Sequence, residues 1–141
     1  MFGQATLAHF PLAGNTNAST NNVGASVALF ASTTWNDNRV YFDEENDNVV
    51  LTANTSTHND LYVSFNTQAD FPWYSFYADL IVEYRTNASA AFTTVETRAI
   101  GESLTLRTFD LPAGVNNQSF LQIRIRVNSG LWGMIWCGSM I

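Results

Sequence analysis

The sequence predicts an all-β protein, an antiparallel β-sandwich of the jelly-roll kind with about 8–10 strands. Three observations lead to this prediction. Several segments alternate apolar and polar side chains with a period of two, which is typical of strands that turn one face toward a core. Clusters of Asn, Ser, Thr and Gly separate these segments, and none has the period of an amphipathic helix. The length of 141 residues is typical of one domain.

Three segments carry the clearest alternation: residues 79–85, 104–107 and 123–127. The last of them alternates aliphatic residues with Arg124 and Arg126. Because successive side chains of a strand point to opposite faces, the aliphatic set lies on one face and the arginines lie on the other.

Six further segments have weaker strand patterns and are bounded by turn residues. They are residues 23–31, 39–42, 49–53, 61–65, 92–97 and 131–141.

The two ends of the chain differ from its middle. Residues 1–22 are mostly small and polar after Phe10 and Leu12. They predict either a first strand with a loop or an arm that reaches onto another subunit, ahead of a sandwich formed by residues 23–141. Residues 131–141 are apolar on both faces, which is typical of a central strand or of one covered by a neighbouring chain. We predict subunit-interface residues at these ends: Phe10, Leu12, Trp132, Met134 and Trp136.

The charge of the chain argues against two classes of partner. The six basic residues are all arginine and stand against twelve acidic residues, which gives a formal net charge of −6. Nucleic acids and anionic membrane surfaces are held mainly by clustered Lys and Arg. We therefore expect neither as a partner. The N-terminus also lacks the basic and apolar regions of a secretory signal, and no stretch has the length and apolarity to cross a bilayer.

Aromatic residues beside Asn and Asp form the most distinctive local pattern. The candidates for binding a partner or a glycan are Trp35, Trp73, Tyr74 and Tyr77. Flat rings beside hydrogen-bonding side chains suit a sugar, which has apolar ring faces and hydroxyl groups. The more common use of such aromatics is in a core or a subunit contact, and the sequence leaves both interpretations open.

Neither a metal centre nor a catalytic site is indicated. The acidic run 43–48 offers oxygen ligands of the type that Ca²⁺ binds, but it lacks EF-hand spacing and also fits an exposed hairpin turn. His9 and His58 lie in no nucleophile or metal motif. Asp79 and Glu83 share one strand face, as paired carboxylates or ordinary surface charges do. We predict a protein that is not an enzyme and has no cofactor.

Residues from Asp79 to Gly130 resemble the second half of a jelly-roll module. The resemblance rests on Asp79-Leu-Ile-Val-Glu-Tyr-Arg-Thr, Leu106-Arg-Thr-Phe-Asp-Leu-Pro-Ala-Gly and Phe120-Leu-Gln-Ile-Arg-Ile-Arg-Val. This group includes carbohydrate-binding modules and virion proteins of viruses and phages, so the resemblance implies a β-sandwich with one of these roles.

The main functional expectation is a virion structural protein. A β-domain without an export signal, with an Asn- and Thr-rich surface and apolar ends, suits a protein that is made in the host cytoplasm and packs into a virion. We expect a capsid decoration (cement) protein, or a small tail or fibre component. It would pack on the major capsid protein as a homo-oligomer such as a trimer. The alternative is a carbohydrate-binding jelly-roll module that uses the four aromatic candidates.

Overall fold

Short antiparallel strands make up most of the computed structural model, with one turn of 3-10 helix and no α-helix in the part that it describes. The structure describes residues 5–12, 15–30, 34–36, 39–42, 45–69, 79–101, 103–128 and 134–137. The strands are β1 (Ala8–His9), β2 (Thr20–Asn21), β3 (Ser26–Phe30), β4 (Thr34–Asn36), β5 (Arg39–Phe42), β6 (Asn48–Ala53), β7 (Tyr62–Ala69), β8 (Asp79–Arg85), β9 (Thr93–Ala99), β10 (Thr105–Asp110), β11 (Leu121–Val127) and β12 (Met134–Cys137). The 3-10 turn η2 spans Ala113–Val115.

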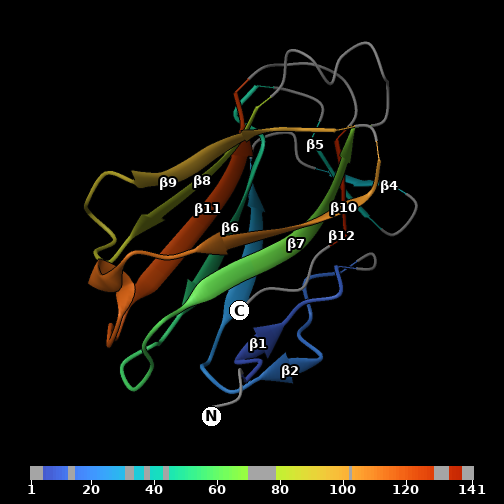
Figure 1. Cartoon of the computed structure of the whole chain (residues 1–141). Coiled ribbons are helices and arrows are strands. Elements are labelled where there is room, and N and C mark those ends of the chain that lie inside the picture. Colours follow the sequence, from blue (N-terminus) through green and yellow to red (C-terminus); the bar gives the residue numbers. More distant parts are fainter. Residues whose placement is uncertain are drawn as a thin grey trace.

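Two five-stranded sheets form the body of the molecule (Figure 1). One has the order β3-β6-β11-β8-β9 and the other the order β10-β7-β12-β5-β4. Strands β5 to β12 follow the jelly-roll order, because β5-β12-β7-β10 alternate with β6-β11-β8-β9, while β3 and β4 extend one edge of each sheet. All pairings are antiparallel. The predicted fold class is confirmed.

The core lies between the two sheets and follows the alternation of the sequence. In β11, Leu121, Ile123 and Ile125 are fully buried, while the residues between them are partly exposed. In the other sheet, the buried rings of Phe65 on β7 and Phe109 on the neighbouring β10 stack with their centroids 5.4 Å apart. Burial of such side chains from both sheets supplies the main driving force for this fold.

The N-terminal segment folds against its own chain. Strands β1 and β2 pair as a small ribbon near one end of the sandwich (Figure 1). The amide of Asn22 donates to the carbonyl of Leu7 at 2.7 Å, and Phe10 and Leu12 join the core. This segment therefore adds apolar side chains to the same core that the two sheets share.

The predicted strands match the structure to different extents. Arg39–Phe42 agrees in both bounds, and the strand predicted at 23–31 is the shorter β3. Strand β10 continues to Asp110, beyond the predicted end at 107. The sequence did not predict β4, whose Trp35 stands among polar residues. Within the described ranges, no helix is long and apolar enough to span a membrane.

Candidate binding surface

The four aromatic residues predicted to bind a partner or a glycan lie largely outside the described residues. Trp73, Tyr74 and Tyr77 fall in the segment 70–78, which is not among them. The backbone of Trp35 lies in β4, and its side chain is outside the description. Sugar binding by these residues stays a prediction.

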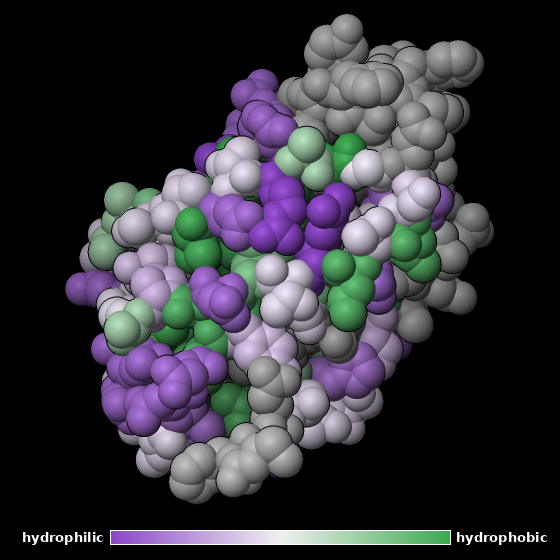
Figure 2. Space-filling view, viewed as in Figure 1, coloured by the Kyte–Doolittle hydropathy of each residue, from purple (hydrophilic) through white to green (hydrophobic). Residues whose placement is uncertain are grey.

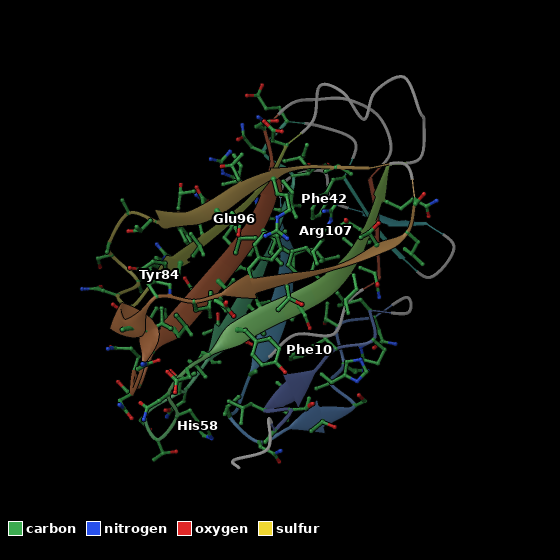
Figure 3. All side chains as sticks on the ribbon, in the orientation of Figure 1. Phe10, Phe42, His58, Tyr84, Glu96 and Arg107 are labelled. Carbon is green, nitrogen blue, oxygen red and sulfur yellow. The ribbon has the colours of Figure 1, made fainter. Side chains whose placement is uncertain are left out.

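The residues predicted for a subunit interface divide into two groups. Phe10, which Figure 3 labels, is 1% exposed and Leu12 is 0% exposed, so this chain covers both side chains by itself. Met134 and Trp136 lie in β12, between β7 and β5, with side chains outside the description. Trp132 lies outside the described residues. A subunit contact through these residues stays a prediction.

The histidines have hydroxyl partners. His9 Nδ1 lies 2.9 Å from the Ser19 hydroxyl, and His58 Nδ1 lies 3.3 Å from the Thr57 hydroxyl. Within the described ranges, neither histidine forms an ion pair with a carboxylate. The arrangement that would favour a catalytic use of these two histidines is therefore not found there.

The acidic run 43–48 is described from residue 45 onward. Asn46 has a φ of 69° in the turn before β6, its amide donates to the carbonyl of Val127, and Asp47 is fully buried. Over the described residues, no group of three or more His, Cys, Asp or Glu side chains is placed to hold a metal ion. Calcium binding by this run stays untested, because Asp43 and Glu44 lie outside the described residues.

The outer face of the β3-β6-β11-β8-β9 sheet carries arginine, amide and carboxylate side chains that contact one another. Strand β11 runs between β6 and β8 and turns Gln122, Arg124 and Arg126 to this face. Register places Arg124 opposite Glu83 and Gln122 opposite Arg85 on β8. Antiparallel pairing thus brings together side chains that are about forty positions apart in the sequence.

Glu83 joins two arginines of this face. Its carboxylate accepts from Arg124 Nε at 2.7 Å and from Arg126 Nε and Nη2 at 3.2 and 3.1 Å. Glu83 is only 5% exposed. Burial alone would raise the pKa of Glu83, but hydrogen bonds from Arg126 and Arg124 and their positive charges hold the pKa below its ordinary value. The group is therefore ionised and fixed in place at neutral pH.

A second set of contacts holds Arg85. Its Nε donates to Gln122 Oε1 at 2.7 Å and its Nη1 donates to the carbonyl of Ala90 at 3.2 Å. Gln122 Nε2 in turn donates to Thr52 Oγ1 on β6 at 3.0 Å. This chain of hydrogen bonds crosses three strands and orients the amide and the guanidinium together.

Phe92 lies just before β9 and contacts both arginines. The guanidinium carbon of Arg124 lies 4.0 Å from the centroid of the Phe92 ring, and that of Arg85 lies 4.4 Å from it. Both distances are within the range of cation–π attraction. The ring therefore restrains the guanidinium groups of both arginines.

These residues line a shallow hollow of about 320 Å³, which we call the face hollow. An aromatic ring, Phe30, stands at the β3 side and is 48% exposed. The other lining residues combine apolar, amide and guanidinium groups: Asn48, Val50, Arg85, Phe92, Gln122 and Arg124. The arrangement can present ring faces and hydrogen-bond donors to one ligand at the same time.

Two other hollows have a different character. One of about 490 Å³ at an end of the sandwich is lined by Asn22, Val23, Gly24, Asn54, Ser56, Thr57 and His58, with no Phe, Tyr or Trp. Figure 2 shows a cluster of hydrophilic residues at the lower left, the end at which the β6–β7 turn lies. The other hollow, of about 330 Å³, is lined by Tyr84, Thr93, Thr94, Val95, Asp110, Leu111 and Pro112. Neither holds an arginine or a pair of aromatic rings.

Sequence reasoning pointed to only part of this surface. It placed Arg124 and Arg126 on one strand face and noted Glu83 as a carboxylate, but it did not connect them. It did not single out the remaining lining residues of the face hollow, which are Phe30, Asn48, Val50, Arg85, Phe92 and Gln122. The only local signal was an arginine at the end of one predicted strand and a phenylalanine at the start of the next.

No protein-family model matches the sequence, and no curated protein matches it. Solved structures do resemble the fold. A mutant of a family 29 carbohydrate-binding module superposes with a TM-score of 0.62 at 14% identity, covering 94% of this chain and 86% of that one. CBM29_1, a family 29 carbohydrate-binding module from Piromyces equi, superposes with a TM-score of 0.60 at 9% identity, covering 89% and 83%. A CBM29-2 mutant complexed with mannohexaose gives 0.59 at 12% identity, covering 94% and 86%.

This chain shares its fold with these proteins. At these identities the likeness establishes the β-sandwich architecture only, so the ligand of this chain has to be inferred from its own residues.

Proposed function

We propose that this chain is a carbohydrate-binding module and that the face hollow is its binding surface. The observation that carries the proposal is the pairing of aromatic and planar polar side chains there. Phe30 and Phe92 offer rings for the apolar faces of a sugar. Asn48, Gln122 and Arg85 offer hydrogen bonds to its hydroxyl groups. Ligand sites typically combine an apolar lining with a few well-placed polar groups.

The likeness to solved structures supports the same reading. The proteins it resembles are carbohydrate-binding modules, and one of them was solved with mannohexaose. That support goes to the carbohydrate-binding alternative of the sequence analysis. The expectation of a capsid decoration protein, and of a capsid protein as partner, gains no support from the fold or from these likenesses.

The test is a glycan array followed by affinity electrophoresis in gels that contain soluble polysaccharides. We expect the protein to bind at least one polysaccharide. Replacement Phe30→Ala should weaken that binding about tenfold, because it removes a half-exposed ring from the hollow. The matched control is Leu106→Ala, which trims a 61% exposed side chain on the other sheet and should leave binding unchanged.

Both variants should keep a melting temperature within about 3 °C of the parent, since each removes an exposed side chain. Absence of binding to every glycan would refute the proposal. Binding that survives Phe30→Ala but is lost in Trp73→Ala would move the site to the aromatic segment that the sequence analysis singled out.

A further inference from the structure

The face hollow is lined by positive charge without an acidic side chain. Arg85 and Arg124 both line it, and its other described lining residues are Phe, Val, Asn and Gln. The chain as a whole has a formal net charge of −6. The hollow therefore has the opposite sign to the average surface of the molecule.

The two arginines differ in how their charge is compensated. Arg124 lies 2.7 Å from the carboxylate of Glu83, which it shares with Arg126. Arg85 donates instead to two neutral acceptors, the amide of Gln122 and the carbonyl of Ala90. Among the residues that the structure describes, no carboxylate lies within ion-pair distance of Arg85. The single carboxylate of Glu83 thus pairs with Arg124 and Arg126, whereas Arg85 donates to neutral partners.

The guanidinium of Arg85 is also held in position before any ligand arrives. Its two hydrogen bonds and its contact with the Phe92 ring restrict its rotamers. A side chain that is already ordered loses less entropy when it binds, so its remaining N–H groups are suited to the oxygen atoms of an anionic group. The side chain retains donors for this purpose, because a guanidinium has five N–H groups.

The negative charge of the rest of the molecule does not cancel this local field. At physiological ionic strength, charges more than about 8 Å apart are largely screened. An anion within the hollow therefore responds mainly to the charges nearby, which are Arg85, Arg124 and Arg126 against the single carboxylate of Glu83. A neutral sugar hydroxyl can accept from the same N–H groups, but an anionic group adds its own charge to the hydrogen bond and can accept two parallel bonds from one guanidinium.

We propose that the face hollow selects acidic glycans, in which Arg85 pairs with a carboxylate or sulfate group of the sugar while Phe30 packs against the sugar ring. This inference rests on the proposed carbohydrate-binding function and narrows the class of ligand. It assigns Arg85 as the residue that determines specificity and Arg124 as its auxiliary cation.

The experiment compares three polysaccharides by isothermal titration and affinity electrophoresis: a polyuronate such as polygalacturonate, a sulfated galactan without carboxylates, and neutral glucomannan. We expect one of the acidic polymers to bind about tenfold or more tightly than glucomannan. Comparison of the two acidic polymers shows whether the hollow binds a carboxylate or a sulfate group. Competition by the free monosaccharide uronate, with unmodified glucose as the neutral counterpart, gives a second measurement on the unaltered protein.

Two variants isolate Arg85. Arg85→Gln should weaken binding of the acidic polymer about tenfold, whereas Arg85→Lys, which keeps the charge but loses the planar group, should fall between Arg85→Gln and the parent. The control is Arg107→Gln, which removes the same charge from β10. Arg107, which Figure 3 labels, likewise donates to neutral acceptors, Thr67 Oγ1 and the carbonyl of Ala99. It belongs to the other sheet and does not line the hollow. Arg107→Gln should leave the preference unchanged.

The possible failures are distinct. Equal or tighter binding of glucomannan, or an unchanged preference in Arg85→Gln, overturns the acidic-glycan inference and leaves carbohydrate binding in place. Binding to no polysaccharide and no monosaccharide overturns both proposals.

Discussion

At the scale of single residues, Glu83 organises the outer face of a sheet. It lies among strands whose opposite faces are apolar, and it accepts hydrogen bonds from both arginines of β11. Removal of one partner from a buried ion pair leaves an uncompensated charge, which is strongly destabilising. Glu83 therefore matters for stability even though it lies outside the core between the sheets.

The lowered pKa of Glu83 predicts a specific pH dependence. Above its ordinary value of 4.5 the group is ionised in both the folded and the unfolded chain, and its ion pairs stabilise the fold fully. As the pH falls below that value, the unfolded chain takes up the proton first, so this contribution is lost as the pH falls through the folded pKa. Urea unfolding should show Glu83→Gln to be destabilised by about 2 kcal/mol at pH 7 and by much less at pH 3.

Glu96→Gln is the control for that experiment. Glu96 pairs with Arg98, but their side chains are 40% and 33% exposed, and such pairs are worth about 0.2–1 kcal/mol. An equal loss at pH 3 and pH 7 in Glu83→Gln would contradict the role of its charge.

At the scale of elements, the N-terminal segment behaves as part of the sandwich. Residues of β1 and of the following stretch are buried with both sheets in one cluster. A segment that is an arm would instead leave its apolar side chains for another subunit. The two possibilities that the sequence left open differ in where Phe10 is buried.

Phe10→Ala distinguishes these possibilities. Since Phe10 is 1% exposed within one chain, the replacement should cost about 3–5 kcal/mol in the free energy of unfolding. Denaturant titration by circular dichroism measures this, with Leu106→Ala as the exposed control. Unchanged stability together with dissociation of an oligomer, followed by light scattering, would instead support the arm and the homo-oligomer predicted from the sequence.

Local patterns predicted strands well and their partners poorly. Alternation depends only on which faces are buried, so Arg39–Phe42 and the arginine-bearing strand β11 could be recognised directly. Strand β4 could not, because Trp35 among Asn and Thr has the composition of a loop. The face hollow depends on register between β8 and β11, and register is decided by the whole packed structure. No local sequence pattern brings Gln122 to Arg85.

At the scale of the whole molecule, the two sheets and the N-terminal ribbon share one core. The buried apolar residues of both sheets and of residues 7–12 form a single cluster. Neither sheet could bury its inner face alone, which makes unfolding of one without the other costly.

Differential scanning calorimetry should therefore show one cooperative transition with equal calorimetric and van't Hoff enthalpies. A separate early transition that disappears on deletion of residues 1–22 would contradict the single core.

The face hollow is shallow, and strands rather than a closing loop form much of its floor. In the proposed complex, the described strands do not enclose the sugar, so the lifetime of the complex depends mainly on the direct contacts with the side chains that line the hollow. On a polymer of repeating units, the hollow could release one unit and take the next before the chain diffuses away. The protein would move along such a polymer by short steps and spread over it, rather than remain at one place.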